Sequence, residues 1–350
     1  MMKELSKNND YISSEKPCFI IAELSANHGG DIEVAKETIR AAKWSGADAI
    51  KMQTYTADTI TINSRKDYFK ITQGTHWDGN YLYDLYKEAS LPWEWHKPLF
   101  ETAKEEGLVC FSSPFDKTAV DFLEGLNTPM YKIASFEITD IPLIKYAASK
   151  QKPMIISTGI AGEEDIKLAI EACNEVGNAD ITILKCTSAY PSLPEDSNLL
   201  TIPDIRERFK VKSGLSDHTM GIEAPIVAVA LGAKVIEKHF ILDKAIGGAD
   251  AHFSLDKFEF KNMVDAVRNA EKILGKVDYE LTDKKMKSRE FSRSLFVTTN
   301  VKEGEIITEN NVKSVRPGYG LHPKHYASLM GKKFNKDFEK GTPLKLSMIN

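Results

Sequence analysis

The strongest constraint on the fold is a unit that recurs eight times between Pro17 and about Leu274. Each unit is a short β-branched run, a polar turn and an amphipathic stretch. The runs occupy residues 18–25, 49–56, 109–115, 130–137, 153–160, 181–187, 211–219 and 234–242. Short runs that are apolar on both faces and alternate with helices are typical of parallel strands covered by helices. Eight such units in roughly 250 residues favour an α/β fold of the (β/α)8 TIM-barrel type over an open doubly wound sheet, which usually has fewer strands.

The pattern changes after Gly275. Residues 281–290 are highly charged and indicate a helix or linker, and the remaining chain alternates in short strands interrupted by five glycines. This texture predicts a small β-rich domain of about 60 residues, which needs a packing partner to be very stable. We therefore expect a barrel domain at 1–282 and a second domain at 283–350.

One segment, from Ala57 to Trp93, interrupts the repeating units. It is longer than most connections between elements, and it carries Trp77, Asp78, Tyr81, Tyr83 and Tyr86. Two interpretations remain open, a lid over a substrate and an insertion with its own packing.

Charge and hydropathy exclude several classes of protein. The formal net charge of −4 disfavours a surface for nucleic acid or anionic membrane. The longest apolar stretch, 224–233, is far shorter than the ~20 residues that span a bilayer, and the polar N-terminus resembles no secretory signal. Cys18, Cys110, Cys173 and Cys186 are well separated and form no CxxC motif, so we expect reduced thiols. These features predict a soluble cytoplasmic protein.

Polar side chains stand at or near the carboxyl end of all eight predicted strands, the end at which barrels perform chemistry. They are Glu23, Lys51, Gln53, Ser112, Ser113, Lys132, Ser135, Glu137, Ser157, Thr158, Lys185, Ser188, Tyr190, Ser216, Asp217, His218, Glu237 and His239. Any one of them has a structural explanation, such as a rim charge or a core histidine. Their presence on every strand is hard to explain by packing, so we expect a functional site at this mouth of the barrel.

Two kinds of group in this set indicate the chemistry. His218 and His239 end adjacent strands and suit a divalent metal such as Mn²⁺, Mg²⁺ or Fe²⁺, although two structural histidines remain an alternative. Lysines and serines from several strands suit a phosphate or carboxylate, which both favour charge-assisted hydrogen bonds. The sequence contains no GxxxxGK[ST] or GxGxxG motif, which disfavours a nucleotide. A small anion together with a metal points to lyase, aldolase or synthase chemistry.

Ordered motifs identify a resemblance. They include FIIAELSANHGG (19–30), KMQTY (51–55), YKIASFE (131–137), KCTSAYP (185–191), GLSDHTMGI (214–222) and ALGAKVIEKHF (230–240). This series resembles the sialic acid synthase family, and residues from 291 onward resemble that family's C-terminal antifreeze-like (SAF, β-clip) domain. The similarity spans nearly the whole chain. Residues 77–89 and 316–324 are most similar to the branch that makes pseudaminic acid.

The resemblance implies a reaction. In this family phosphoenolpyruvate (PEP) condenses with an N-acyl amino sugar aldehyde, and phosphate leaves by C–O cleavage, with Mn²⁺ or Mg²⁺ as the metal. For the pseudaminic acid branch the sugar is 2,4-diacetamido-2,4,6-trideoxy-L-altrose. A synthase of N-acetylneuraminate or legionaminate, using N-acetylmannosamine or a related sugar, remains the alternative.

The resemblance also implies roles for individual residues. PEP would contact Lys51, Ser113, Lys132, Ser135, Ser157, Ser188 and Ser216. His218 and His239 would bind the metal, Glu23 and Glu137 would lie near the reacting atoms, and Gln53, Tyr190, Asp250 and Arg316 would contact the sugar. Arg316 would reach it from the partner subunit of a domain-swapped homodimer. Ser188 departs from the Asn that family members making N-acetylneuraminate often have there.

Two other readings compete with this one. A Schiff-base aldolase would use Lys132 or Lys185 as a desolvated amine without a metal. A carbohydrate-binding scaffold without enzyme activity would leave recognition to the small domain.

Overall fold

The computed structural model describes residues 11–72, 74 and 77–350. The chain divides into two compact units, the first ending at Gly275 and the second running from Lys276 to Asn350. The boundary expected between 282 and 283 falls inside the second unit and stays a prediction.

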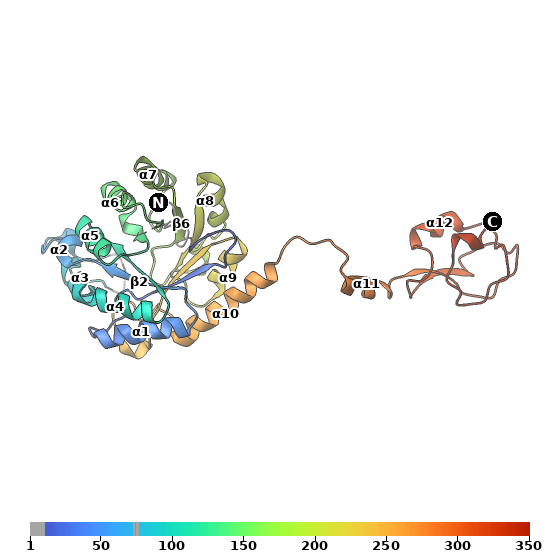
Figure 1. Cartoon of the computed structure of the whole chain (residues 1–350), viewed down its shortest axis with the longest axis horizontal. Coiled ribbons are helices and arrows are strands. Elements are labelled where there is room, and N and C mark those ends of the chain that lie inside the picture. The colour runs from blue at the N-terminus through green and yellow to red at the C-terminus, as the bar shows by residue number, and fades with distance from the viewer. Residues whose placement is uncertain (1–10, 73, 75–76) are drawn as a thin grey trace, which may run out of the picture. The chain divides into compact units, whose positions relative to one another are not determined.

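The first unit is a closed barrel of eight parallel strands, in which each strand pairs with the next and β1 pairs with β8 (Figure 1). The strands are β1 (Phe19–Glu23), β2 (Ala49–Thr54), β3 (Val109–Pro114), β4 (Tyr131–Ile133), β5 (Met154–Ser157), β6 (Ile181–Cys186), β7 (Lys212–Asp217) and β8 (Val235–His239). Every strand lies within one of the eight predicted runs, so the predicted TIM barrel is confirmed.

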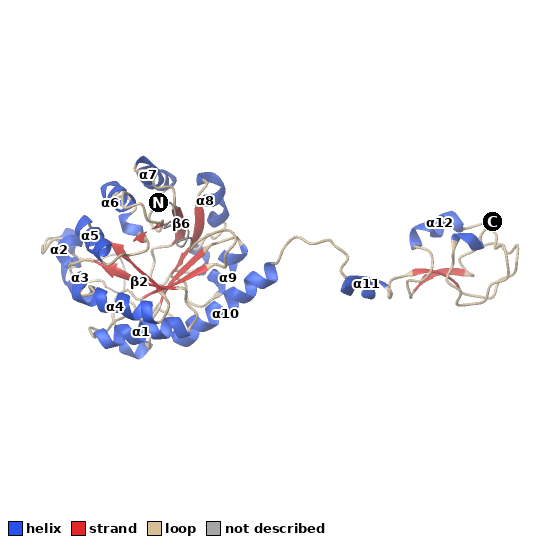
Figure 2. Ribbon diagram, viewed as in Figure 1, coloured by secondary structure: helices blue, strands red, loops and turns tan. Residues whose placement is uncertain are grey.

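Helices surround the strands (Figure 2). They are α1 (Ile32–Trp44), α2 (Ala57–Ile60), α3 (Leu82–Ala89), α4 (Trp93–Glu105), α5 (Lys117–Gly125), α6 (Ile141–Ala148), α7 (Glu163–Glu175), α8 (Thr201–Phe209), α9 (Glu223–Ala230) and α10 (Lys257–Leu274). Capping side chains fix where helices begin, as at α10. The Asp256 carboxylate accepts hydrogen bonds from two backbone amides of the first turn, and the Glu259 carboxylate accepts one from the Asp256 amide. Of the helices described, none has the length and apolar composition needed to cross a membrane.

Apolar side chains fill the half of the barrel interior nearest the amino ends of the strands. This interior cluster consists of Ile12, Phe19, Ile21, Ala49, Phe111, Met130, Ile155, Leu184 and Val235. Because side chains alternate between the two faces of a strand, the residues two positions further along point inward as well. Those positions hold Glu23, Lys51, Ser113, Lys132, Ser157, Cys186 and Glu237. The interior is thus apolar at one end and polar at the other.

The segment between β2 and α4 contains α2, a 3-10 turn (Asp67–Phe69) and α3. It has contacts of its own: Arg65 forms an ion pair with Asp84, and the Tyr83 hydroxyl donates to Asp58. The Trp77 ring lies 6.0 Å from the ring of Tyr190. The segment therefore packs on itself and also reaches a residue of the predicted site, so the choice between insertion and lid stays open. Residues 73, 75 and 76 of this segment lie outside the described residues.

The second unit is small and β-rich. It contains α11 (Asp283–Arg289), an antiparallel pair of strands β9 (Ser294–Val297) and β10 (Val312–Val315), and α12 (Tyr326–Leu329). Its core includes Leu295, Val312, Phe334 and Leu344. The predicted small β-rich domain is confirmed.

Candidate active site at the mouth of the barrel

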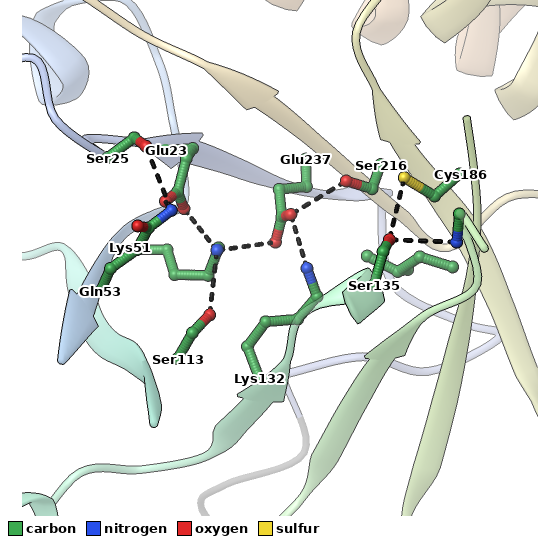
Figure 3. A network of polar contacts seen from close by, with 12 residues as sticks. Glu23, Ser25, Lys51, Gln53, Ser113, Lys132, Ser135, Cys186, Ser216 and Glu237 are labelled. Carbon is green, nitrogen blue, oxygen red and sulfur yellow. Dashed lines mark hydrogen bonds and ion pairs between the residues drawn. The ribbon is translucent and has the colours of Figure 1, made fainter. Parts of the chain in front are cut away.

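The centre of the polar half of the barrel is the carboxylate of Glu237. Its Oε1 accepts from Lys132 Nζ at 2.7 Å and from Ser216 Oγ at 3.0 Å (Figure 3). Its Oε2 lies 3.8 Å from the Nζ of Lys51. Strands β4 and β8 are not neighbours, so the contact from Lys132 to Glu237 crosses the barrel interior. Closure of the barrel is what brings these side chains together.

A second carboxylate, Glu23, joins the same network. Its Oε2 lies 2.6 Å from the Nζ of Lys51, and its Oε1 accepts from Gln53 Nε2 at 3.1 Å. Lys51 also donates to Ser113 Oγ at 3.2 Å. Glu23, Lys51, Gln53, Ser113, Lys132 and Ser216, all predicted from the sequence, therefore lie in one connected cluster (Figure 3).

The two carboxyl groups of this network differ in acidity. Burial raises the pKa of Glu23 to about 7, although the nearby Lys51 opposes that rise. Burial alone would also raise the pKa of Glu237, but Lys132 and Lys51 lower it to about 2. Glu237 is thus a fixed anion, whereas Glu23 can take up or release a proton near neutral pH, as a general acid or base must.

Hydroxyl groups line the side of the mouth formed by the ends of β4, β5 and β6. Ser135 Oγ accepts from the Gly159 amide at 3.0 Å and donates to Cys186 Sγ at 3.3 Å. A Cβ atom at Gly159 would lie only 2.0 Å from Ser188 Oγ, so any larger residue here would have to displace the Ser188 side chain. Ser157 Oγ is buried and finds no hydrogen-bond partner among the described residues. A buried hydroxyl without a partner is unfavourable, and an oxygen of a bound anion would satisfy it.

The two histidines lie side by side, with ring centroids 5.3 Å apart. His218 Nδ1 lies 2.8 Å from the carbonyl oxygen of Thr187. Because a carbonyl only accepts, Nδ1 carries a proton, so Nε2 is the ring nitrogen that can bind a metal. Burial alone would lower the pKa of His218, but the nearby Cys186 raises it, so a metal at Nε2 would have to displace a second proton. His239 Nδ1 is buried and has no hydrogen-bond partner in the part of the chain that the structure describes.

These residues fit a divalent cation. Burial lowers the pKa of His239 well below its ordinary value, which keeps the imidazole neutral, the form that binds metals. No group of three or more His, Cys, Asp or Glu side chains within the described ranges is arranged to hold a metal. Two imidazoles alone would leave the other coordination positions open to substrate and water, as catalysis by a metal requires.

Two of the predicted sugar-side residues, Tyr190 and Asp250, lie beside the histidines. The Tyr190 ring lies 4.3 Å from the His218 ring, and Asp250 Oδ2 lies 3.7 Å from His239 Nδ1. Asp250 also accepts from the hydroxyl of Ser25.

Glu137 follows β4 in a 3-10 turn (Ser135–Glu137). Its Oε2 is buried, with no hydrogen-bond partner among the residues described, and burial raises its pKa to about 7. Glu137 therefore supplies another carboxyl group that titrates near neutral pH.

Arg316 is an exposed residue of the second unit, so its proposed contact with the sugar stays a prediction. Lys185, one of the two Schiff-base candidates, donates to the Cys186 carbonyl and to Thr187. The other candidate, Lys132, has a pKa lowered by burial, but its ion pair with Glu237 opposes loss of the proton.

Sequence reasoning missed three residues of the site. The sequence predicts Glu237 as a strand-end residue without a role, and it predicts no role for Gly159 or Cys186. Burial alone would raise the pKa of the Cys186 thiol, but His218, 3.8 Å away, lowers it to about 7. The alternation of β6 and β8 was the available signal, since Cys186 and Glu237 each lie two residues beyond an interior apolar residue.

Comparison with known proteins gives a consistent result. The chain is 54% identical to the pseudaminic acid synthase of Campylobacter jejuni over 96% of this chain and 97% of that protein. It is 37% identical to the N,N'-diacetyllegionaminic acid synthase of Legionella pneumophila over 95% and 94% of the two chains. Among solved structures, the N-acetylneuraminic acid synthetase of Leptospira borgpetersenii, crystallised with citrate, superposes with a TM-score of 0.70 at 30% identity. That match covers 78% of this chain and 90% of the other.

Family models match both parts of the chain. Residues 292–350 match the SAF domain, which confirms the predicted antifreeze-like domain. Residues 38–279, most of the barrel, match the NeuB family. The chain therefore belongs to the NeuB family.

Proposed function

We propose that this protein condenses PEP with 2,4-diacetamido-2,4,6-trideoxy-L-altrose to give pseudaminic acid and phosphate. The observation that carries the choice of sugar is the 54% identity, over nearly the full length, to a pseudaminic acid synthase. Identity to a legionaminic acid synthase is only 37% over a similar span. The chemistry of the barrel mouth supports the choice of PEP, because ammonium groups and hydroxyls converge there.

The lysines and serines bind PEP. Lys51 and Lys132 supply two buried positive charges, with the hydroxyls of Ser113, Ser135 and Ser216 nearby (Figure 3). Ser157 and Ser188 supply two further hydroxyls. Charge-assisted hydrogen bonds to a phosphate and a carboxylate hold the molecule in one orientation, which lowers the entropic cost of the reaction. In the free protein the carboxylate of Glu237 pairs with Lys132 and lies 3.8 Å from Lys51, whose nearer partner is Glu23, so PEP competes with these carboxylates for the lysines.

Glu23 and Glu137 move protons. The C3 atom of PEP forms a bond to the aldehyde carbon of the sugar, and water adds to C2. The bond from C2 to the phosphate oxygen then breaks, the oxygen that came from water becomes the C2 carbonyl, and its remaining proton goes to the released phosphate. Glu23, with its pKa near neutral, takes the proton from the water. Glu137, also titrating near neutral pH, donates a proton to the oxygen that forms from the aldehyde.

His218 and His239 hold the divalent metal, Mn²⁺ or Mg²⁺. A cation held by these two imidazoles would supply Lewis-acid polarisation of the sugar aldehyde. Gln53, Tyr190 and Asp250 position the sugar beside it.

The protein works as a homodimer, in which the partner subunit's Arg316 contacts the N-acyl group of the sugar. An arginine shared in this way makes the dimer necessary for activity.

The test is a phosphate-release assay with PEP and Mn²⁺. It is run in parallel with the altrose derivative, with other 2,4-diacetamido-trideoxy hexoses and with N-acetylmannosamine. We expect release with the altrose derivative, at least about tenfold lower kcat/KM with the others, and loss of activity with EDTA. A preference for N-acetylmannosamine would contradict the choice of sugar, and no release with any sugar would contradict the reaction.

The metal ligands are tested separately. His218→Ala and His239→Ala should each abolish metal-dependent turnover, because a single imidazole cannot hold the ion in place. Activity near the wild-type value in either variant would contradict the assignment.

A further inference from the structure

An ion pair lies behind the two histidines, on the helix-facing side of the barrel wall. Asp217 at the end of β7 and Lys238 in β8 are direct partners in the register of the two strands. The Lys238 ammonium contacts Asp217 Oδ2. Both residues are almost completely buried, with exposed fractions of 3% and 1%.

Thr219 closes this pair into a ring. Lys238 Nζ donates to the Thr219 carbonyl at 2.6 Å, while Asp217 Oδ1 accepts from the Thr219 amide at 2.9 Å and its hydroxyl at 2.8 Å. These hydrogen bonds thus connect Asp217, which precedes His218, to Thr219, which follows it. The backbone on both sides of His218 is fixed by these contacts.

The surroundings of the pair are apolar. The preceding cross-strand pair on the same face is Leu215 with Ile236, and both belong to the apolar layer between the strands and helices. Removing two charges from water costs so much that a buried ion pair often stabilises a fold no better than apolar residues of similar size. Stability alone therefore does not explain why charged residues occupy this position.

The position relative to the histidines does explain it. Asp217 immediately precedes His218, and Lys238 immediately precedes His239. Because side chains alternate along a strand, the pair lies on the outer face while both imidazoles are directed inward. A link from Asp217 to Lys238 thus joins the two strand ends at the point from which the imidazoles project.

We propose that the Asp217–Lys238 ion pair positions the histidines, holding the ends of β7 and β8 at the separation that lets His218 and His239 bind one divalent cation. This inference rests on the proposed function, in which those two residues are the metal ligands. Asp217 and Lys238 act through the histidines and touch neither metal nor substrate, so they are positioning residues.

The test measures Mn²⁺ binding to the substrate-free full-length protein, from the electron paramagnetic resonance signal of the unbound ion. Asp217→Asn and Lys238→Met each remove one charge of the pair. We expect the dissociation constant for Mn²⁺ to rise about 10- to 100-fold, the effect typical of residues that orient metal ligands. The Mn²⁺ concentration for half-maximal activity should rise in parallel. The KM for PEP at saturating Mn²⁺ should stay within about twofold, because the PEP-binding groups are untouched.

Two further variants separate positioning from general stability. Asp48→Asn breaks a partly buried ion pair with Arg268 (2.7 Å) at the opposite end of the barrel, so it should lower thermal stability without changing Mn²⁺ affinity. Thr219→Val removes only the hydroxyl contact to Asp217 and should weaken Mn²⁺ binding by a few-fold. This milder change keeps the proposal testable if a charge variant fails to fold.

The outcomes are distinct. The inference is overturned if a folded Asp217→Asn or Lys238→Met variant binds Mn²⁺ within twofold of the wild-type affinity. If neither variant folds, the same result in Thr219→Val overturns it. An equal loss of Mn²⁺ affinity in Asp48→Asn would also overturn it. A wild-type protein that binds no Mn²⁺ would overturn it as well. The wild-type protein could also bind Mn²⁺ through the histidines but release no phosphate. That result would contradict the proposed function, and the Mn²⁺ affinities of the variants would still decide the inference about the ion pair.

Discussion

At the scale of single residues, the charge balance of the barrel mouth depends on Glu237. Two buried lysines, Lys51 and Lys132, share its carboxylate, and Glu23 has a pKa near neutral. Without the negative charge of Glu237, the buried ammonium groups of Lys51 and Lys132 would have only the incompletely ionised Glu23 as a counter-ion. This makes Glu237 both a structural counter-ion and the group that PEP must displace.

Glu237→Gln tests this role. Removing one partner of a buried ion pair should lower the free energy of unfolding by about 3–5 kcal/mol, measured by urea denaturation. The KM for PEP should fall, because a neutral amide no longer competes with PEP for the two lysines. The matched control is Glu175→Gln, which breaks an exposed ion pair of the same length, 2.7 Å, with Lys145. The control should cost less than about 1 kcal/mol. If both substitutions lowered the free energy of unfolding equally, burial of the Glu237 network would not strengthen its contribution to stability.

Gly159 is the second residue whose identity carries a prediction. A Cβ atom there would lie 2.0 Å from Ser188 Oγ and 2.7 Å from Ser135 Oγ, so Gly159→Ala must displace both hydroxyls. We expect the KM for PEP to rise at least about tenfold while the protein stays folded. Gly125→Ala is the control, because a Cβ atom there meets nothing within 4 Å. An unchanged KM for PEP in Gly159→Ala would remove these two serines from the phosphate site.

At the scale of elements, the contact between β7 and β8 sets the spacing of the histidines. Gly214 in β7 faces Val235 in β8, and a Cβ atom at Gly214 would lie 2.5 Å from the Val235 carbonyl oxygen. Gly214→Ala would therefore push the strands apart or shift them.

We expect Gly214→Ala to lower the free energy of unfolding by about 1–3 kcal/mol, as overpacking of a core typically does, measured by urea denaturation. The neighbouring Ser213→Ala deletes a buried hydroxyl that has no hydrogen-bond partner among the described residues, and it should be neutral or stabilising. A Gly214→Ala protein as stable as the wild type would mean that the two strands tolerate a wider spacing.

The same elements show why much of the site was predictable. Alternation within a strand separates inward from outward residues, so the apolar residues of the barrel interior predict that Glu23, Lys51 and Lys132 share a common space. Neighbouring serines show where the prediction stopped. Sequence reasoning placed Ser112 and Ser113 together at the end of β3. In the structure only Ser113 contacts Lys51, whereas Ser112 contacts Thr54.

The contacts of Glu237 could not be predicted, because they depend on strand register and on side chains that meet across the barrel. The pairing of Ser216 with Glu237, and the reach of Lys132 across the interior to Glu237, follow from how eight strands are staggered. No local pattern encodes that stagger, because it results from the closure of the whole sheet. Glu237 therefore looked like one strand-end residue among many until the strands were placed.

At the scale of the whole molecule, the second unit contributes Arg316 to the proposed function. A single exposed arginine before a proline carries no local sign of a substrate contact, so its role came from family resemblance alone. The proposal that it acts from the partner subunit makes a specific prediction about mixed dimers.

A heterodimer of His239→Ala and Arg316→Ala subunits, purified with two different tags, should regain activity. One of its two barrels keeps both histidines and receives Arg316 from the His239→Ala partner, so about half the wild-type activity per dimer is expected. Each homodimeric variant should be nearly inactive. If Arg316 served its own barrel, the heterodimer would be as inactive as the homodimers, and an active monomer on gel filtration would also contradict the shared site.

The central claim of this account is that barrel closure gathers two imidazoles, two lysines and a set of serines around one metal ion and one molecule of PEP. The most direct test is a crystal structure of the full-length protein with Mn²⁺ and PEP, with the metal located by anomalous scattering. The account predicts one Mn²⁺ peak bound by both His218 and His239, with the PEP phosphate against Lys132 and Ser157. A peak that contacts neither histidine, or PEP bound away from both lysines, would contradict it.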